Sequence, residues 1–385
     1  MKNSVPIFSA LLYSVLSFST GMYAQSNVHL RVVGGNLEDK GAVILPVEDG
    51  AYAIGTTSSH GDGTVRGYVV FYDDNLDYQW SLITPYGSLV EKISDAVLSP
   101  DPTSDNILVL SNRLGNNGTY NTVVHEINNQ TTSGEIESTI EIESPINQNT
   151  SSIVNWRGST YAFGDMEGDG WYIDLGDELA VASGDYYVWG HPVLTESVNS
   201  ARVQNDTLYV VGSTVVDGVE QSTVWVWGPD GSSLWAKIAP DENAFGNNYA
   251  NDIAVYEGGS TLLYSYEREG LPIGHGIIKF DQGDGTPGGI VNTSGDIYVE
   301  GTTLISHDDS FYKLAHINYN SGSGTDIVVT RLGLYGGYLA SNSLGTDFDE
   351  TPSDMKIDEE GRVWIVGTTY GFLNGSASML SLIHI

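Results

Sequence analysis

The chain has 385 residues, 40% of them hydrophobic, so it is long enough to bury a large core in one domain or in several. Its 49 acidic and 15 basic residues give a formal charge of −34, which disfavours binding to nucleic acid and to anionic lipid headgroups. Because it contains no cysteine, disulfides, thiolate nucleophiles, cysteine-bound metals and a cysteine-linked lipid anchor are excluded.

The first 24 residues have the pattern of a secretory signal peptide. Lys2 precedes an apolar run that ends near Phe18, and small and polar residues with a plausible cleavage point after Ala24 follow. The run is short and interrupted by serines, and no later segment approaches the roughly 18 apolar residues that a membrane span requires. We therefore expect a secreted domain at residues 25–385 that does not insert into a membrane.

Beyond this segment, one unit recurs along the whole chain. Each copy consists of a turn followed by an alternating apolar strand, which in the clearest copies ends in Gly-Thr-Thr or Gly-Ser-Thr. The copies lie roughly 50 residues apart, which is the period of propeller blades. They begin near Asp49, Asn106, Ser159, Asn205, Ser260, Ser310 and Glu360.

Three further strands can be assigned around each copy. A shorter strand precedes it, as in SDAVLSP (94–100), and we assign this strand as the innermost one. A third strand follows, as in GYVVFYDD (67–74), and the outermost strand is clearest around Trp80 and Trp235. These two tryptophans occupy the same rank in their repeats, so we expect them to pack between adjacent blades, where the wedge opens toward the rim.

The two ends of the chain are predicted to complete one blade together. The last repeat ends after its third strand, SASMLSLIHI (376–385), whereas NVHLRVVGG (27–35) is an unassigned strand before the first repeat. Pairing of the two would close the ring and remove two exposed strand edges.

The number of blades depends on one irregular segment. GDIYVEGTT (295–303) repeats the Gly-Thr-Thr ending only about 35 residues after the preceding unit, which leaves six or eight blades open. The interval from Leu262 to Val363 is close to two repeats, and SFYKLAHI (310–317) supplies a strand midway. We predict an all-β fold with a single propeller of about seven four-stranded blades.

Residues 49–57, 199–214 and 353–369 carry the glycine-closed strand most clearly. They resemble bacterial secreted β-propeller repeat proteins, the group that includes the SBBP-type and delta-60-type repeats. The resemblance implies an extracellular location and a role in binding or display, with no shared reaction. The signal sequence, ending in AQS, is similar to those of Bacteroidota.

A polar residue opens the innermost strand in four repeats, at Asp95, Asn199, Asp252 and Asp354. If these side chains faced the central channel, their oxygens would suit a hard cation, and Ca²⁺ at Asp95, Asp252 and Asp354 is the cofactor that we consider. The preferred interpretation is structural, because an aspartate at this point can accept backbone hydrogen bonds and fix the turn that begins the blade.

The third blade departs from the repeat pattern in its aromatic residues. Trp171, Tyr186, Tyr187 and Trp189 lie outside the repeated strand positions. Exposed aromatic side chains stack on sugars and anchor protein partners, so these four are our candidates for contact residues, although core packing is the preferred interpretation because aromatic side chains are so often buried.

No motif in the sequence indicates a reaction. HExxH zinc sites, GxSxG elbows and phosphate-binding glycine loops are not found. We therefore expect a secreted, monomeric, non-enzymatic module that binds a glycan or a protein partner and no nucleic acid. The alternative is a secreted polysaccharide hydrolase or lyase whose carboxylates converge at the channel mouth from different blades.

Overall fold

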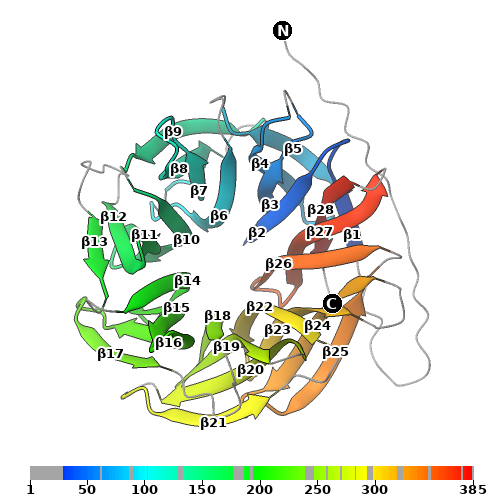
Figure 1. Ribbon diagram of the computed structural model, residues 1–385. Coiled ribbons are helices and arrows are strands. Elements are labelled where there is room, and N and C mark those ends of the chain that lie inside the picture. The colour runs from blue at the N-terminus through cyan, green and yellow to red at the C-terminus, as the bar shows by residue number, and fades with distance from the viewer. Residues whose placement is uncertain are drawn as a thin grey trace, which may run out of the picture.

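Seven four-stranded antiparallel sheets stand as blades around a central axis (Figure 1). This computed structural model describes residues 29–383 except 61–62, 86–89, 102, 129–132, 145, 177–185, 191–193, 239–246, 257–258, 269–270, 282, 293–297, 319–323, 346–347 and 374–375. The predicted signal peptide therefore lies outside the described residues. No helix in the described part of the chain is long and apolar enough to cross a membrane.

Each blade runs from an innermost strand at the channel to an outermost strand at the rim. Blade 1 contains β2 (Asp39–Val47), β3 (Gly50–Thr57), β4 (Arg66–Asp73) and β5 (Tyr78–Ile83). Blade 2 contains β6 (Glu91–Leu98), β7 (Ile107–Leu114), β8 (Tyr120–Asn128) and β9 (Glu135–Ile142). Blade 3 contains β10 (Gln148–Trp156), β11 (Ser159–Met166), β12 (Asp169–Gly176) and β13 (Tyr186–Trp189).

The remaining blades continue the same order. Blade 4 contains β14 (Thr195–Gln204), β15 (Thr207–Val216), β16 (Val219–Trp227) and β17 (Ser233–Ile238). Blade 5 contains β18 (Asn248–Tyr256), β19 (Gly259–Arg268), β20 (Leu271–Asp281) and β21 (Pro287–Asn292). Blade 6 contains β22 (Tyr298–His307), β23 (Ser310–Asn318), β24 (Thr325–Gly333) and β25 (Tyr338–Leu344). Blade 7 contains β26 (Asp349–Ile357), β27 (Val363–Leu373), β28 (Ser376–Ile383) and β1 (His29–Val33).

The predicted fold and blade count are confirmed. All seven copies of the repeated strand are second strands of blades, from β3 to β27. The described part of the irregular segment, residues 298–303, belongs to β22, the innermost strand of blade 6, so it does not add a blade.

The N-terminal strand closes the ring, as predicted. β1 pairs antiparallel with β28, in a register that runs from His29 opposite Ile383 to Val33 opposite Met379. The seam between blades 7 and 1 carries polar ties as well. The Arg31 Nε donates to the Leu76 carbonyl at 2.8 Å. Blade 7 is thus built from both ends of the chain (Figure 1).

The hydrophobic core is divided into clusters that lie between neighbouring blades. Trp80 is 5% exposed and packs in a cluster with residues of blades 1 and 2, and Trp235 does the same between blades 4 and 5. A glycine of the next blade makes room for each ring. A Cβ on Gly134 would approach the Trp80 ring to 2.4 Å, and a Cβ on Gly285 would approach the Trp235 ring to 2.5 Å. The interblade packing predicted for both tryptophans is confirmed.

The seam predicts a test by substitution. Val33 is 9% exposed in the core between blades 7 and 1, so Val33→Asp would bury a carboxylate without a partner. We expect a loss of about 3–5 kcal/mol in the free energy of unfolding, measured with urea. Leu37→Asp, at a side chain that is 48% exposed, is the matched control and should change it by less than about 0.5 kcal/mol. Equal effects of the two variants would show that β1 does not hold the seam.

Candidate functional site

The innermost strands surround a central channel whose lining is almost entirely polar. The channel contains a cavity of about 140 Å³, lined mainly by serine, threonine, asparagine and aspartate side chains together with Arg202 and Lys356. Every innermost strand has a register shift at the same place, as between Ile93 and Asp95 or between Ala250 and Asp252. The shared bulge sets which side chain enters each interface between blades.

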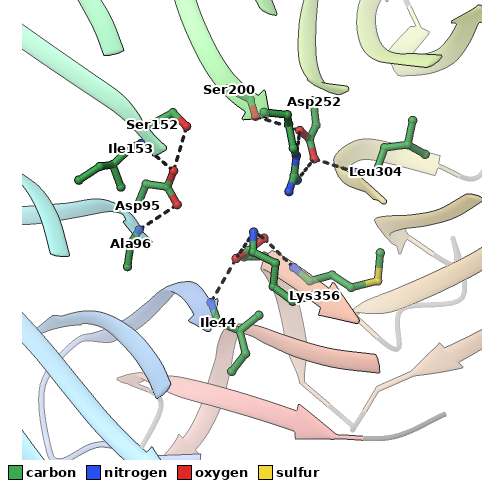
Figure 2. A network of polar contacts seen from close by, with 12 residues as sticks. Ile44, Asp95, Ala96, Ser152, Ile153, Ser200, Asp252, Leu304 and Lys356 are labelled. Carbon is green, nitrogen blue, oxygen red and sulfur yellow. Dashed lines mark hydrogen bonds and ion pairs between the residues drawn. The ribbon is translucent and has the colours of Figure 1, made fainter. Parts of the chain in front are cut away.

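Three aspartates follow these bulges and connect one blade to the next (Figure 2). Asp95 accepts the Ile153 N–H of blade 3 at 2.9 Å, and Asp252 accepts the Leu304 N–H of blade 6 at 3.0 Å. Asp354 accepts the Ile44 N–H of blade 1 at 3.2 Å, across the closing seam. An innermost strand has one edge without a neighbouring strand, so its outward N–H groups need another acceptor. The carboxylates supply it, and we call these three residues the aspartate latches.

Asn199, the fourth predicted member, occupies a different position. It lies in the bulge, between Val198 and Ser200, so the residue equivalent to the latches in blade 4 is Ser200. The Asn199 Nδ2 donates to the Ala250 carbonyl at 2.6 Å, and the Ser200 hydroxyl donates to Asp252 at 2.9 Å. The prediction that Asn199 corresponds to the aspartates is wrong by one residue, because the extra residue of the bulge shifts the register.

Two cations compensate the charge of the latches. The Arg202 Nη2 contacts the Asp252 carboxylate at 2.6 Å, and the Lys356 Nζ lies 3.2 Å from that of Asp354. Burial alone would raise the pKa of Asp252, but Arg202 holds it below its usual range. Burial does raise the pKa of Asp95, and the charge of Lys356 opposes that shift only in part.

This arrangement favours the structural role over a calcium site. The carboxylate oxygens already accept backbone N–H groups, and two of the three carboxylates contact a cation. Within the described residues, no three His, Asp or Glu side chains are grouped so as to hold a metal ion. Calcium binding by Asp95, Asp252 and Asp354 stays a prediction, but their geometry is explained without it.

A second ring of polar residues was missed in the sequence. The latch position is the residue that follows the bulge in each innermost strand. In six blades an acid or an amide lies four residues before it, and all six of these side chains are at most 5% exposed. Several accept groups of the preceding blade, as when Asn248 accepts the Ser222 N–H at 2.8 Å. The signal was present, but it is divided among four residue types. The six residues are Asp39, Glu91, Gln148, Glu196, Asn248 and Glu350.

Glu91 is a member of this ring that four side chains contact. It accepts the Ser111 hydroxyl at 2.6 Å and contacts the His125 Nε2 at 2.7 Å. The Arg113 Nη2 lies 3.2 Å away, and the Thr84 hydroxyl donates at 2.8 Å. Although burial alone would raise the pKa of Glu91, these partners lower it to about 2.

The four predicted aromatic contact residues fall into two groups. Trp171 is 0% exposed in the core between blades 2 and 3, so its prediction as a contact residue is wrong. Trp189 is half-buried and packs edge-on against Trp225 and Trp227 of blade 4. Tyr186 and Tyr187 are 39% and 57% exposed. Strand rank explains the burial of Trp171, because β12 lies between β11 and β13, whereas Tyr186, Tyr187 and Trp189 belong to the outermost strand, β13.

Tyr187 is part of an exposed aromatic stack on blade 3. Its ring lies 5.0 Å from that of Tyr172, with an angle of 17° between the ring planes. Asp174 lies two residues along the same strand, so it faces the same side as Tyr172. Its carboxylate bonds the Tyr161 hydroxyl, and burial together with Asp174 raises the pKa of Tyr161 to about 12. Arg157 is exposed, and its guanidinium lies 5.4 Å from the Trp156 ring. We define the blade 3 aromatic surface as four residues: Tyr172, Tyr187, Asp174 and Arg157.

Comparisons with known proteins support the fold. No protein family matches the sequence, and no curated protein does. The WD40 domain of Pan2 from Neurospora crassa is similar over 89% of this chain and 88% of that one, with a TM-score of 0.55 and 10% identity. The β-propeller domain of the Trilobed protease from Pyrococcus furiosus covers 89% of this chain and 97% of its own, with a TM-score of 0.50 and 10% identity. The polysaccharide lyase Uly1 is similar over 91% of this chain and 89% of its own chain, with a TM-score of 0.50 and 9% identity. At such identities the likeness shows the fold alone.

The latch role of Asp95 can be separated from a cation-binding role. Asp95→Ala removes the acceptor of the Ile153 N–H and should cost about 1–3 kcal/mol in the free energy of unfolding. Asp95→Asn keeps a carbonyl oxygen and should cost little at neutral pH. The raised pKa means that folding favours the protonated carboxyl of Asp95. Its contribution to stability is therefore complete at low pH and is lost as the pH rises, so the neutral amide loses little by comparison at neutral pH. Thermal melts at neutral pH with and without Ca²⁺ check both points; a melting temperature that Ca²⁺ raises only in the wild type would support the ion instead.

Glu91 predicts part of the acid sensitivity of the protein. Its pKa is about 2 in the folded protein against an ordinary 4.5, so its stabilising contribution is complete above about pH 4.5 and is lost as the pH falls toward 2. The full difference corresponds to roughly 3 kcal/mol. Glu91→Gln should therefore flatten the dependence of the unfolding free energy on pH in this range, as measured by urea titrations at successive pH values. An unchanged slope would rule out Glu91 as its source.

Proposed function

We propose that the protein is an exported, non-enzymatic binding module that takes an uncharged glycan on its blade 3 aromatic surface. The observation that carries this proposal is the exposed Tyr187 ring, which is stacked on Tyr172 instead of being buried between blades. Export rests on the predicted signal peptide at residues 1–24.

The chemistry of the surface suits a sugar. A pyranose ring has an apolar face of C–H groups that stacks on an aromatic ring, and a rim of hydroxyls that needs hydrogen-bonding partners. Tyr187 offers a ring face, while Asp174 offers carboxylate oxygens and Arg157 offers planar N–H donors. Because Tyr172 supports the ring of Tyr187 from one side, binding would order few additional side-chain torsions.

The charge of the protein narrows the class of glycan. A net charge of −34 repels polyanions such as sulfated or uronate-rich chains when they come within about one Debye length of the surface. An uncharged polysaccharide avoids this repulsion. A protein partner would need a larger apolar anchor than two neighbouring tyrosine rings provide, so the glycan is the class that we propose.

A binding screen with matched variants tests the proposal. The folded protein is titrated with uncharged glucans, mannans and xylans, and product release is followed in the same samples. Tyr187→Ala should weaken binding about tenfold, which corresponds to ~1.4 kcal/mol, whereas Tyr187→Phe should retain the stacking and most of the affinity. Tyr370→Ala, at a ring that is 38% exposed on blade 7, is the control and should bind as the wild type does.

Three outcomes would contradict the proposal. Binding that Tyr187→Ala leaves unchanged would place the contact surface elsewhere. Absence of binding to every uncharged glycan, with capture of a protein partner instead, would replace the glycan. Release of shortened saccharides would show a hydrolase or a lyase and would move the search to the carboxylates of the channel.

A further inference from the structure

The outermost strand of blade 6 is an exposed edge without charge. β25 runs from Tyr338 to Leu344, and each of its first six residues is exposed. It ends its sheet, so one side of its backbone has no strand beside it in the described part of the chain. The strand contains no Asp, Glu, Lys, Arg or Pro. Such an edge presents free N–H and C=O groups to any extended strand that approaches.

The outermost strands of other blades carry the usual protection. β9 contains three glutamates, β17 contains Lys237, and β21 begins with Pro287. β13 has only four residues, and β5 is half-buried over its last three residues beyond the buried Trp80. Charges, prolines, shortness and burial all discourage pairing between sheet edges. β25 has none of these features, and it is the longest of the outermost strands without a charged residue, so it offers the longest unprotected edge.

The hairpin that leads into β25 is exposed and apolar. Its turn, closed by the Gly333 N–H to Gly337 carbonyl bond, projects Tyr335, which is 91% exposed. Tyr338 and Leu339 are 67% and 55% exposed. The matching turn of blade 1 holds Asp73, whose carboxylate accepts two backbone N–H groups of the turn. Blade 6 therefore places apolar surface beside its open edge.

The charge distribution decides which partner fits. Between Asp326 and Asp347 the only charged residue is Arg331, in a chain with 49 acidic residues. Two copies of a protein of net charge −34 repel each other unless they meet at a neutral part of the surface. The outer hairpin of blade 6 has no acidic residue between these two positions, and the Lys279 Nζ of blade 5 lies 4.8 Å from the Tyr335 ring, so this part of the surface lacks the negative charge that drives the repulsion. An antiparallel strand pair is also self-complementary about a twofold axis, so the same edge serves both copies.

We propose that β25 pairs antiparallel with β25 of a second copy of this chain, with Ser341 near the twofold axis. Tyr335, Tyr338 and Leu339 of each copy then lie at the ends of the joined strands, where they lose water-exposed area. The dimer departs from the monomer expected from the sequence. It would also present two blade 3 aromatic surfaces, one on each copy, and a polymer that reaches both would bind more tightly than either site alone.

The test measures self-association of the whole mature chain by sedimentation equilibrium, from micromolar to near-millimolar protein. We expect a monomer–dimer equilibrium that tightens at least about threefold between 0.1 M and 1 M NaCl, since the Debye length falls from about 10 Å to about 3 Å. Ser341→Lys sets two like charges opposite each other at the axis and should abolish the dimer. Ser233→Lys, on the exposed start of β17, adds the same charge elsewhere and should leave the dimer intact.

Both serines are exposed, so we expect both variants to fold. Thermal melts and circular dichroism are measured alongside to check this. A protein that stays monomeric at every concentration and salt level overturns the proposal. A dimer that Ser341→Lys and Ser233→Lys affect equally also overturns it, because the contact would then lie outside β25. Neither outcome bears on glycan binding at Tyr187, which is measured on the monomer.

Discussion

The unpaired inner edge of each blade is the constraint on which this propeller depends. Seven innermost strands face a common channel, and each ends its sheet, so in the described part of the chain its inner edge has no strand beside it to accept the backbone N–H groups. Asp95, Asp252 and Asp354 provide acceptors for three of these edges, and each aspartate does so from the preceding blade. Each bond therefore satisfies a donor and joins two blades. In a protein without disulfides, such ties and the β1–β28 pairing close the ring.

This constraint changes how the acidic residues are interpreted. Carboxylates at a channel mouth are candidates for catalysis or for metal binding on residue type alone. Here the latches bind backbone N–H groups, Arg202 and Lys356, and the outer acid Glu91 is bound by hydroxyls, Arg113 and His125. The side chains of blade 3 have a different position. Tyr187 contributes little to the interface between blades and keeps a ring face in water. That contrast is why the proposed function is placed at the rim.

Periodic features of the sequence predicted most of the fold. The seven apolar strands, the closing N-terminal strand, and Trp80 and Trp235 all recur at a fixed rank, and packing between blades demands them there. Features shifted by one residue or by one strand were not predictable. The bulge displaces Asn199 from the latch position. Trp171 is buried in the third strand of blade 3, whereas the exposed Tyr187 lies in the outermost strand. The ring that contains Glu91 was missed because its members are four different residue types, which share a position before the bulge and their burial but no single side chain.

The central claim is that a rigid, latched ring binds its ligand at the rim and not in the channel. A crystal structure of the protein grown with the uncharged oligosaccharide that binds most tightly tests this claim most directly. We predict a sugar ring stacked on Tyr187, with hydroxyls toward Asp174 or Arg157 and with all three aspartate latches unchanged. A saccharide bound in the channel, with Asp95, Asp252 or Asp354 turned away from the next blade to contact it, would contradict the account.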